Sequence, residues 1–345
     1  MNIQDFTKRV KQNENLPYED MLQAVELIFN EETPKEAIAE FLVELHKKGE
    51  TVEEIAALSI VMKSNALKVP ALKDKYMDNC GTGGDGLKTF NISTSSAFVL
   101  AAGGVKVAKH GNRKISSDSG STDVLQALGI HTVDFTIEES AQLLKQEGLT
   151  FLYAPYVHPK LKRIGEVRRA IGKPTIFNLT GPLTNPVDLE TQLVGINRPK
   201  FVHEYAEVLR MLGRKRAIVV SGSEGMDEAS LDHRNRCVLL EDGEIKPFSI
   251  NLEELNLQPA SIQHLRGGTP EDNATILKDL LRGKRSPYYD AVVLNAGLGF
   301  FAYGKAESLQ EGVFMARETI ESGLAYEKLE AVKEFSQNIL KEKAI

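Results

Sequence analysis

The strongest constraint on the fold is a glycine-rich segment, residues 81–86, which reads Gly-Thr-Gly-Gly-Asp-Gly. Glycine has no Cβ, so this backbone can adopt positive φ angles and leaves its N–H groups accessible to an anion. The hydroxyl-rich segment 91–94 (Asn-Ile-Ser-Thr) follows, and we expect a helix from Ser93 to Ala102. A helix N-terminus attracts phosphate through its unpaired N–H groups and its dipole. The segment therefore predicts a phosphate-binding turn, with an ordinary tight turn as the alternative.

A second candidate anion-binding loop reads Lys-His-Gly-Asn-Arg at residues 109–113. It follows an expected buried strand at Val105–Ala108, and open α/β sheets bind ligands at the carboxyl ends of their strands. Several serines after this loop lead into another expected helix, Ser121–Leu128. Charged residues of this kind more often form a solvated surface turn. Together with the glycine segment, however, they indicate a cradle for a doubly phosphorylated small molecule.

Two adjacent carboxylates, Asp227 and Glu228, follow an expected strand at Ala217–Val220. Carboxylate oxygens are ligands that Mg²⁺ prefers, and substrate phosphates commonly complete its coordination. An isolated Asp-Glu pair is usually ordinary surface. Two candidate phosphate loops in the same chain make a magnesium site the favoured interpretation.

Other familiar chemistries receive no support from the motifs. The glycine segment is not a Walker A motif, because no Gly-Lys-Ser/Thr follows it, and it lacks the acidic residue about 20 positions on that a Rossmann fingerprint needs. The cysteines have no recognisable His partner, and His158 and the other scattered histidines lack metal-ligand spacing. A basic helix expected at Pro159–Ile171 carries Arg168 and Arg169. Such a helix is usually a solvated face, although an Arg turned into a cleft can clamp a carboxylate.

Composition limits the class of protein. A length of 345 residues suits two domains on the usual scale. The net charge of −6, from 48 acidic and 42 basic residues, argues against general nucleic-acid binding. Two cysteines fit a reducing compartment. The N-terminus lacks the pattern of a signal peptide, and no apolar stretch approaches the ~20 residues that span a bilayer. We therefore expect a cytoplasmic protein with no membrane or nucleic-acid partner.

Helix-start signals divide the chain. Residues 1–70 predict consecutive helices with short connections, including one at Tyr18–Asn30 and two that begin with capping boxes at Thr33 and Thr51. Helices of this kind favour a small bundle. Their wide apolar faces, which include Phe41, Leu42, Leu45, Ile55 and Leu58, favour packing against a second subunit.

From about Tyr76, short apolar strands alternate with helices, among them a helix with a capping box at Thr136 and a strand at Ala291–Leu294. This alternation predicts a mostly parallel sheet covered by helices. The expected fold class is α/β. A small helical domain at 1–70, joined by part of 155–190, precedes a large α/β domain at 71–345.

Together these motifs resemble the anthranilate phosphoribosyltransferase family over nearly the whole chain. The family's Thr-Ile-Phe-Asn-Leu-x-Gly-Pro-Leu-Thr-Asn-Pro signature stands at Thr175–Pro186, while Ser221 occupies a place often held by His. The resemblance implies a nucleoside phosphorylase/phosphoribosyltransferase-like fold. It also implies transfer of phosphoribose from 5-phosphoribosyl-1-pyrophosphate (PRPP) to the amine of anthranilate, with release of pyrophosphate.

The resemblance implies a set of substrate contacts as well. Those to PRPP are Gly81, Gly84, Asp85, Thr89, Asn91, Ile92, Ser93, Thr94, Lys109, His110, Gly111, Asn112, Arg113, Lys114, Ile115, Ser116, Ser117 and Ser121. Those to anthranilate are Gly81, His110, Asn112 and Arg168. Two Mg²⁺ ions per monomer would be bound by Ser93, Asp227 and Glu228. No covalent nucleophile or general base is expected, because the aromatic amine is already neutral at pH 7.

Two other functions remain open at the level of sequence. A pyrimidine nucleoside phosphorylase shares the architecture, but Asp227-Glu228 disfavours it because phosphorolysis has no pyrophosphate–magnesium complex to hold. A non-catalytic, nucleic-acid-binding relative would carry a basic surface, which this acidic composition disfavours. The resemblance also points to a homodimer formed through the N-terminal helices.

Overall fold

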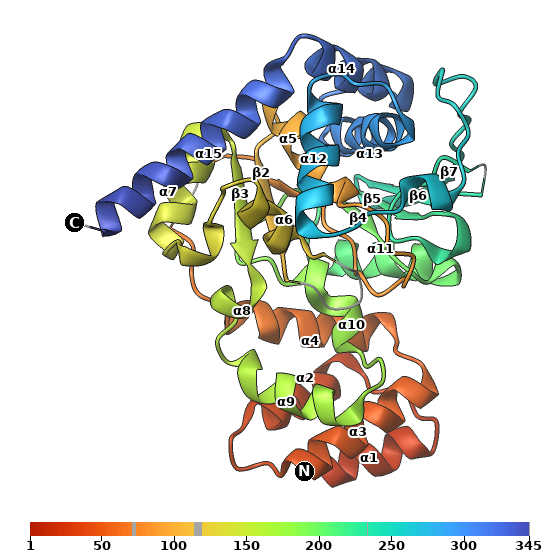
Figure 1. Ribbon diagram of the computed structural model, residues 1–345. Coiled ribbons are helices and arrows are strands. Elements are labelled where there is room, and N and C mark those ends of the chain that lie inside the picture. Colours follow the sequence, from red (N-terminus) through yellow and green to blue (C-terminus); the bar gives the residue numbers. More distant parts are fainter. Residues whose placement is uncertain (71–73, 114–118, 233, 345) are drawn as a thin grey trace.

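A single twisted sheet organises the larger part of the molecule (Figure 1). The computed structural model describes the chain apart from residues 71–73, 114–118, 233 and 345. Within these described residues the sheet has seven strands: β1 (Met77–Asp78), β2 (Val107–Gly111), β3 (Leu149–Tyr153), β4 (Thr191–Gly195), β5 (Arg216–Ser221), β6 (Arg236–Glu241) and β7 (Glu244–Phe248).

The order of the strands places a switch point at the centre of the sheet. The order is β3-β2-β1-β4-β5-β6-β7; the first five strands are parallel, and β6 and β7 are antiparallel additions. The chain runs outward from β1 through β2 to β3 and then returns to β4 on the other side of β1. Open α/β sheets bind ligands at the carboxyl ends of the strands beside such a switch point. The mostly parallel α/β fold predicted from the sequence is confirmed.

Helices cover both faces of the sheet. One face packs against buried helices led by α5 (Ile92–Ala102) and α13 (Pro287–Tyr303), and the other packs against α11 (Val202–Met211). The remaining elements of this part are α6 (Ser121–Ala127), η1 (Thr132–Asp134), α7 (Ile137–Glu147), η3 (Pro199–Phe201), η4 (Ser223–Gly225), η5 (Ile262–Leu265), α12 (Pro270–Leu281), α14 (Leu309–Glu321) and α15 (Leu324–Lys343).

Helices from two stretches of the chain make up the lower part of Figure 1. They are α1 (Ile3–Lys11), α2 (Tyr18–Phe29), α3 (Lys35–Lys48) and α4 (Val52–Ser64), followed by α8 (Ala154–Val157), α9 (Leu161–Ile171), α10 (Phe177–Thr180) and η2 (Gly181–Leu183). Helix α9 packs on α3, α10 packs on α4, and α4 packs on α11. One apolar cluster therefore continues from this part to the face of the sheet that α11 covers.

Several local predictions are confirmed and others are wrong. The capping boxes at Thr51 and Thr136 are present. Helix α3 begins instead after Pro34, without a side-chain capping bond, so the Thr33 cap is wrong. The strand expected at Ala291–Leu294 is a stretch of α13. That helix is apolar on all sides because it is enclosed on all sides, and a short apolar run does not distinguish a buried helix from a buried strand.

Two further expectations need correction. Strand β2 begins two residues later than expected, at Val107, and therefore includes Lys109 and His110 rather than preceding them. The apolar side chains of α3 and α4 that suggested a second subunit, from Phe41 to Leu58, are fully buried within this chain. They therefore give no evidence for an interface. No described helix is long and apolar enough to cross a membrane.

The two confirmed capping boxes differ in burial and make a matched test of stability. Glu54 is fully buried and accepts hydrogen bonds from the N–H of Thr51, the N–H of Leu16 and the ammonium of Lys48. Glu139 accepts from the N–H of Thr136 and from Lys343, but it is partly exposed.

Replacing Glu54 by Ala leaves buried donors unpaired, so we expect the free energy of unfolding to fall by about 3–5 kcal/mol. Glu139→Ala mainly removes a capping hydrogen bond and should lower the free energy of unfolding by about 0.5–2 kcal/mol. Denaturant unfolding of both variants measures the difference. Equal losses would show that burial does not determine the contribution of the capping glutamate.

Candidate active site

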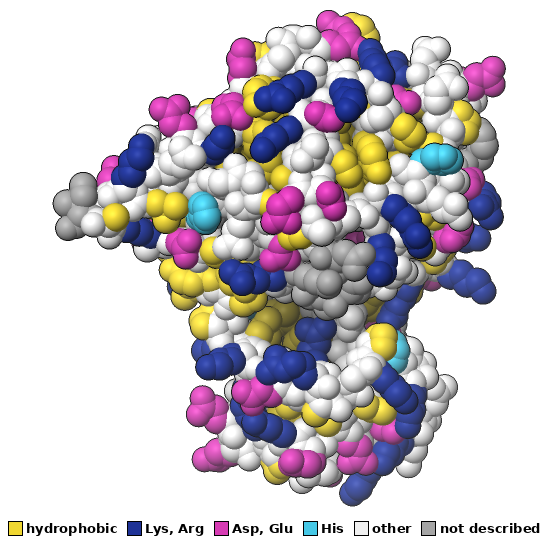
Figure 2. Space-filling view, viewed as in Figure 1, with side chains coloured by type: hydrophobic (Ala, Val, Ile, Leu, Met, Phe, Trp, Pro, Cys, Tyr) yellow, Lys and Arg dark blue, Asp and Glu magenta, His cyan; other side chains and the backbone are white. Residues whose placement is uncertain are grey.

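A cleft of about 340 Å³ opens at the carboxyl ends of β1 and β2, where the α/β part meets α4 and α8–α10. Figure 2 shows the hollow between the two parts of the molecule, with Lys and Arg side chains gathered beside it. The position next to the switch point is where the strand order predicts a ligand site.

The glycine segment after β1 forms one wall of the cleft, with positive φ at Gly83, Gly84 and Gly86. The N–H of Gly83 donates to Asp227 Oδ2 at 2.7 Å. A Cβ at Gly81 would collide with the Asp227 side chain, so only glycine allows this close approach. The glycine segment and the predicted metal carboxylates therefore lie in direct contact.

A buried carboxylate, Asp78, holds three walls of the cleft together. It ends β1, and its side chain accepts hydrogen bonds from the N–H of Cys80 (3.0 Å), the N–H of His110 (3.3 Å) and the amide of Asn185 (2.9 Å). Asn185 also donates to the carbonyl of Ala108 at 2.7 Å. Hydrogen bonds to an ionised acceptor are stronger than neutral ones. One side chain thus fixes the starts of both candidate phosphate loops and the segment that follows η2.

Two histidine rings line the cleft beside η2. His110 Nδ1 lies 2.9 Å from the carbonyl of Gly181, so Nδ1 carries the hydrogen and Nε2 is an acceptor. Burial lowers the pKa of His110, which favours the neutral ring. His158 packs edge-on against it with ring centroids 5.2 Å apart, and burial lowers the pKa of His158 to about 3. Among the described residues, neither Nε2 atom has a hydrogen-bond partner.

The carboxylates Asp227 and Glu228 face the glycine segment and the start of α5. Glu228 Oε1 accepts from the N–H of Ser93 at 3.2 Å, and Asp85 lies against the N–H of Asp227 at 3.5 Å. Burial and the charge of Asp85 raise the pKa of Asp227 above its usual value. Burial and the charge of Asp227 likewise raise the pKa of Glu228. Enclosed like charges of this kind favour a bound cation.

The described side chains do not complete a metal site by themselves. Among the described residues no three His, Cys, Asp or Glu side chains form a group that could hold a metal ion. Asp227, Glu228 and the Ser93 hydroxyl are hard oxygen ligands, and they lie beside two candidate phosphate loops. This donor set fits Mg²⁺ when phosphate oxygens supply the remaining positions.

Arg168 and Arg169 point in different directions, as adjacent helical residues must. Arg168 lines the cleft, donates to Asn178 Oδ1 at 3.4 Å and lies over the Phe177 ring, 5.6 Å from its centroid. Burial lowers the pKa of its guanidinium. Arg169 is exposed. The cleft therefore holds the Arg168 guanidinium beside an aromatic ring, and the ligand of this side chain remains a prediction.

Most of the predicted contact residues share this cleft. Those that line it are Gly81, Gly84, Asn91, Ser93, Thr94, Lys109, His110, Gly111, Asn112, Arg113, Ser121, Arg168, Asp227 and Glu228. Asp85, Thr89 and Ile92 do not line it: Asp85 contacts Asp227, Thr89 pairs with Arg266, and Ile92 is buried. The predictions for Lys114, Ile115, Ser116 and Ser117 lie outside the described residues.

Several residues that shape the cleft have no role among the predictions made from the sequence. Asp78, Asn185 and His158 are buried and act on parts of the chain that are distant in sequence. Asn295 is another example. Its side-chain amide accepts a hydrogen bond from the N–H of Ala229 and donates one to the Ala229 carbonyl, each at 2.9 Å, next to Glu228. A polar residue inside an apolar run, as Asn295 is in α13, was the one local signal available.

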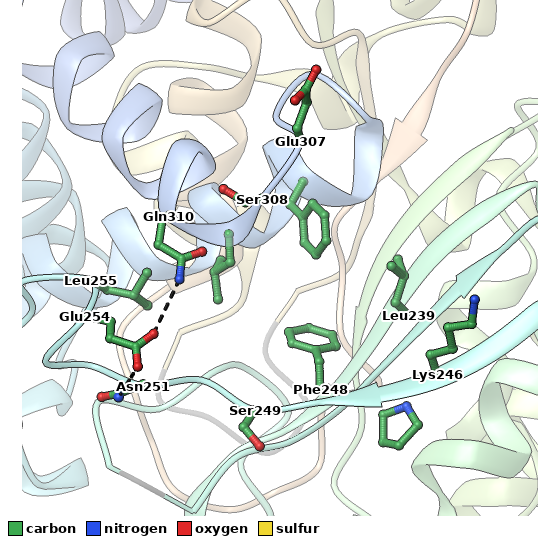
Figure 3. Close-up of a pocket in the computed structure, with 13 residues that line it drawn as sticks. Leu239, Lys246, Phe248, Ser249, Asn251, Glu254, Leu255, Glu307, Ser308 and Gln310 are labelled. Atoms are coloured by element: carbon green, nitrogen blue, oxygen red, sulfur yellow. Dashed lines mark hydrogen bonds between the residues drawn. The ribbon is translucent and has the colours of Figure 1, made fainter.

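A second cavity of about 280 Å³ lies away from this cleft, between β6–β7 and the start of α14 (Figure 3). Phe248 and Phe301 line it, and Glu254 on its wall accepts hydrogen bonds from the side chains of Asn251 and Gln310. None of the predicted site residues lies there. The cleft beside the switch point is therefore the candidate active site.

Comparison with known proteins agrees with this geometry. Residues 4–66 match the helical bundle domain of the glycosyl transferase family, and residues 73–326 match its a/b domain. An anthranilate phosphoribosyltransferase from Exiguobacterium sibiricum is 49% identical over 97% of this chain and 98% of its own length. The chain belongs to the anthranilate phosphoribosyltransferase family.

Solved structures of this family share the whole fold. The Thermus thermophilus anthranilate phosphoribosyltransferase superposes with a TM-score of 0.90 at 39% identity, covering 96% of this chain and 99% of that one. The Saccharomyces cerevisiae enzyme, in complex with PRPP and Mg, gives a TM-score of 0.88 at 26% identity, with 97% and 98% of the two chains covered. The family resemblance and the fold class predicted from the sequence are both confirmed.

Proposed function

We propose that this protein transfers 5-phosphoribose from PRPP to the amine of anthranilate, giving N-(5-phosphoribosyl)anthranilate and pyrophosphate in tryptophan biosynthesis. The observation that carries the proposal is the contact between Gly83 N–H and Asp227 at 2.7 Å. It joins the candidate phosphate-binding loop to a carboxylate pair suited to Mg²⁺, at the switch point of a family fold. A substrate with a pyrophosphate leaving group needs both features in one place.

The residues of the cleft would act mainly on the leaving group. Breaking the bond from C1 of ribose to oxygen places positive charge on the sugar and negative charge on pyrophosphate. The glycine segment and the start of α5 would direct N–H groups at the pyrophosphate, and Lys109 would add a positive charge. Bound Mg²⁺, held by Ser93, Asp227 and Glu228 at two positions per monomer, would neutralise developing charge on the phosphate oxygens.

The other wall of the cleft would hold the acceptor. Arg168 would pair with the carboxylate of anthranilate, and the neutral His110 would accept a hydrogen bond from its amine through Nε2. The amine is neutral at pH 7, so it needs orientation rather than a strong base. Gly81 and Asn112 complete this wall. Enclosure of the cleft by α8–α10 would keep water from the activated sugar.

The alternatives fit less well. A nucleoside phosphorylase would not need the enclosed Asp227–Glu228 pair, because inorganic phosphate attacks without a pyrophosphate–magnesium complex to bind. A nucleic-acid-binding relative would need a basic surface, whereas Figure 2 shows Asp and Glu side chains among the Lys and Arg.

The assembly and placement of the protein are also proposals. We place the domain boundary near residue 70, between the helical bundle and the α/β part. We propose a homodimer through the N-terminal helices, where Ile60 is 40% exposed, and sedimentation of the pure protein tests it. Two buried, unpaired cysteines, Cys80 and Cys237, fit a cytoplasmic location.

A fluorescence assay of Arg168 and its neighbour tests the reaction and the acceptor together. Wild-type protein should consume anthranilate fluorescence only when PRPP and Mg²⁺ are both present. Arg168→Ala removes a charge-assisted hydrogen bond of roughly 1.5–3 kcal/mol, so KM for anthranilate should rise about ten- to a hundredfold. Arg169→Ala is the matched control and should change either KM by less than about twofold. No turnover by the wild type, or a larger defect in Arg169→Ala, would contradict the assignment.

Isosteric substitutions test the metal carboxylates. The double variant Asp227→Asn/Glu228→Gln keeps the shape of both side chains but removes their charges. Turnover should fall on the order of a hundredfold or more, because charge stabilisation of the leaving group is lost. Added Mg²⁺ should not restore it. Glu224→Gln, an exposed change on the same loop, should leave the magnesium titration unaltered. Wild-type activity of the double variant would refute the metal assignment.

A further inference from the structure

The turn between β4 and η3, residues 196–198, packs against the glycine segment. Asn197 Nδ2 donates to the carbonyl of Gly83 at 3.1 Å. One residue earlier in the segment, the N–H of Thr82 donates to the carbonyl of Gly195 at 2.9 Å. Strands β1 and β4 are adjacent and parallel, so their following loops meet at the switch point. The end of β4 and the turn after it therefore contact the 81–82 and 83–84 peptide units, on either side of the unit whose N–H donates to Asp227.

The bond from Asn197 determines the direction of an N–H group. In a trans peptide unit, the carbonyl of Gly83 and the N–H of Gly84 point in opposite directions. Fixing the Gly83 oxygen therefore fixes the Gly84 N–H. Gly83 and Gly84 have φ of 69° and 79°, and glycines on both sides would let an unrestrained peptide unit rotate.

The same peptide bond lies where phosphate donors are expected. The Gly83 N–H is already committed to Asp227. By contrast, the N–H groups of Gly84, Asp85 and Gly86 have no acceptor within the part of the chain that the structure describes. Gly84 also lines the cleft. Asn197 thus restrains one of the free donors of the segment, at a glycine that lines the cleft.

The turn that carries Asn197 is itself anchored to the helical part. Arg198 Nη1 lies 2.8 Å from Glu50 Oε2, between α3 and α4, and His46 Nδ1 lies 2.8 Å from Glu50 Oε1. Burial opposes the charge of Glu50, but the bonds from Arg198 and His46 outweigh it and hold the pKa of Glu50 below its usual value. A buried carboxylate that contacts both Arg198 and His46 therefore holds the turn against the helical part.

We propose that Asn197 is a positioning residue for substrate binding: it aims the Gly84 N–H at the pyrophosphate group. The inference rests on the proposed function, since a pyrophosphate-bearing substrate must occupy the cleft. Asn197 touches the backbone of Gly83 rather than the substrate, so its loss should weaken binding of PRPP and leave the anthranilate wall unchanged.

The test replaces Asn197 by Leu, which has a similar shape and no donor, and adds no charge near the phosphates. Calorimetry with Mg²⁺ should show the Kd for PRPP rising about fivefold or more, the equivalent of one hydrogen bond. KM for anthranilate at saturating PRPP should stay within twofold. Hydrogen exchange of the peptide covering residues 81–88 should become faster. If the leucine side chain disturbs folding, Asn197→Ala serves as the second variant, and it should show the same loss of affinity for PRPP.

Asn65→Leu is the matched control, because the Asn65 amide also donates to a backbone carbonyl, that of Val61 at 2.8 Å, outside the glycine segment. It should leave PRPP binding and exchange at 81–88 unchanged. A Kd for PRPP within twofold of wild type in both Asn197 variants would overturn the proposal, as would an equal shift in Asn65→Leu. If the wild-type protein binds no PRPP, the proposed function fails. Hydrogen exchange still tests the role of Asn197 in that case: an exchange rate at residues 81–88 that is the same in the Asn197 variants and in the wild type would overturn it.

Discussion

The cleft depends on the hydrogen bonds of one buried carboxylate. Asp78 stands at the end of β1, the middle one of the five parallel strands, and accepts hydrogen bonds from Cys80, which precedes the glycine segment, from His110 in β2 and from Asn185. Each of these walls carries different groups: the backbone N–H groups proposed to bind phosphate, the His110 ring and the segment beside Gly181. Burying a charge is costly unless hydrogen bonds and a counter-charge compensate it. Arg214, buried nearby, interacts favourably with the charge of Asp78.

The parallel sheet explains why these walls meet. Strands β1, β2 and β4 run in the same direction side by side, so the loops that follow them emerge at one edge. Asp227 and Glu228 lie in the loop between β5 and β6, and β6 then runs back antiparallel beside β5. The ends of these strands and the loops after them therefore bring together residues that are far apart in the chain, namely 81, 110, 197 and 227. The helices of the N-terminal part and α8–α10 then close the open side of this edge.

Much of this arrangement could be predicted from the sequence where the signal is local. The glycine segment and the capping boxes at Thr51 and Thr136 each depend on residues within a turn or two. The choice of Arg168 over Arg169 for the cleft came instead from the family resemblance. Asp78 and Asn197 could not be found from local signals, because the partners that give them their roles are distant: Asn185 lies 107 residues from Asp78, and Gly83 lies 114 residues from Asn197. The strand expected at Ala291–Leu294 failed for another reason. Burial on every side removes the periodicity that identifies a helix.

Asp78 holds both proposed substrate walls in place through these hydrogen bonds, and binding to an Asp78→Asn variant tests this role most directly. An amide replaces one acceptor oxygen by a donor, which opposes the N–H groups that Asp78 holds. Calorimetry for PRPP with Mg²⁺ and steady-state kinetics for anthranilate should both show affinity losses of about tenfold, consistent with one or more lost charged hydrogen bonds. Asp188→Asn, a change at an exposed carboxylate, is the control. Affinities within twofold of wild type for both substrates in Asp78→Asn would contradict the account.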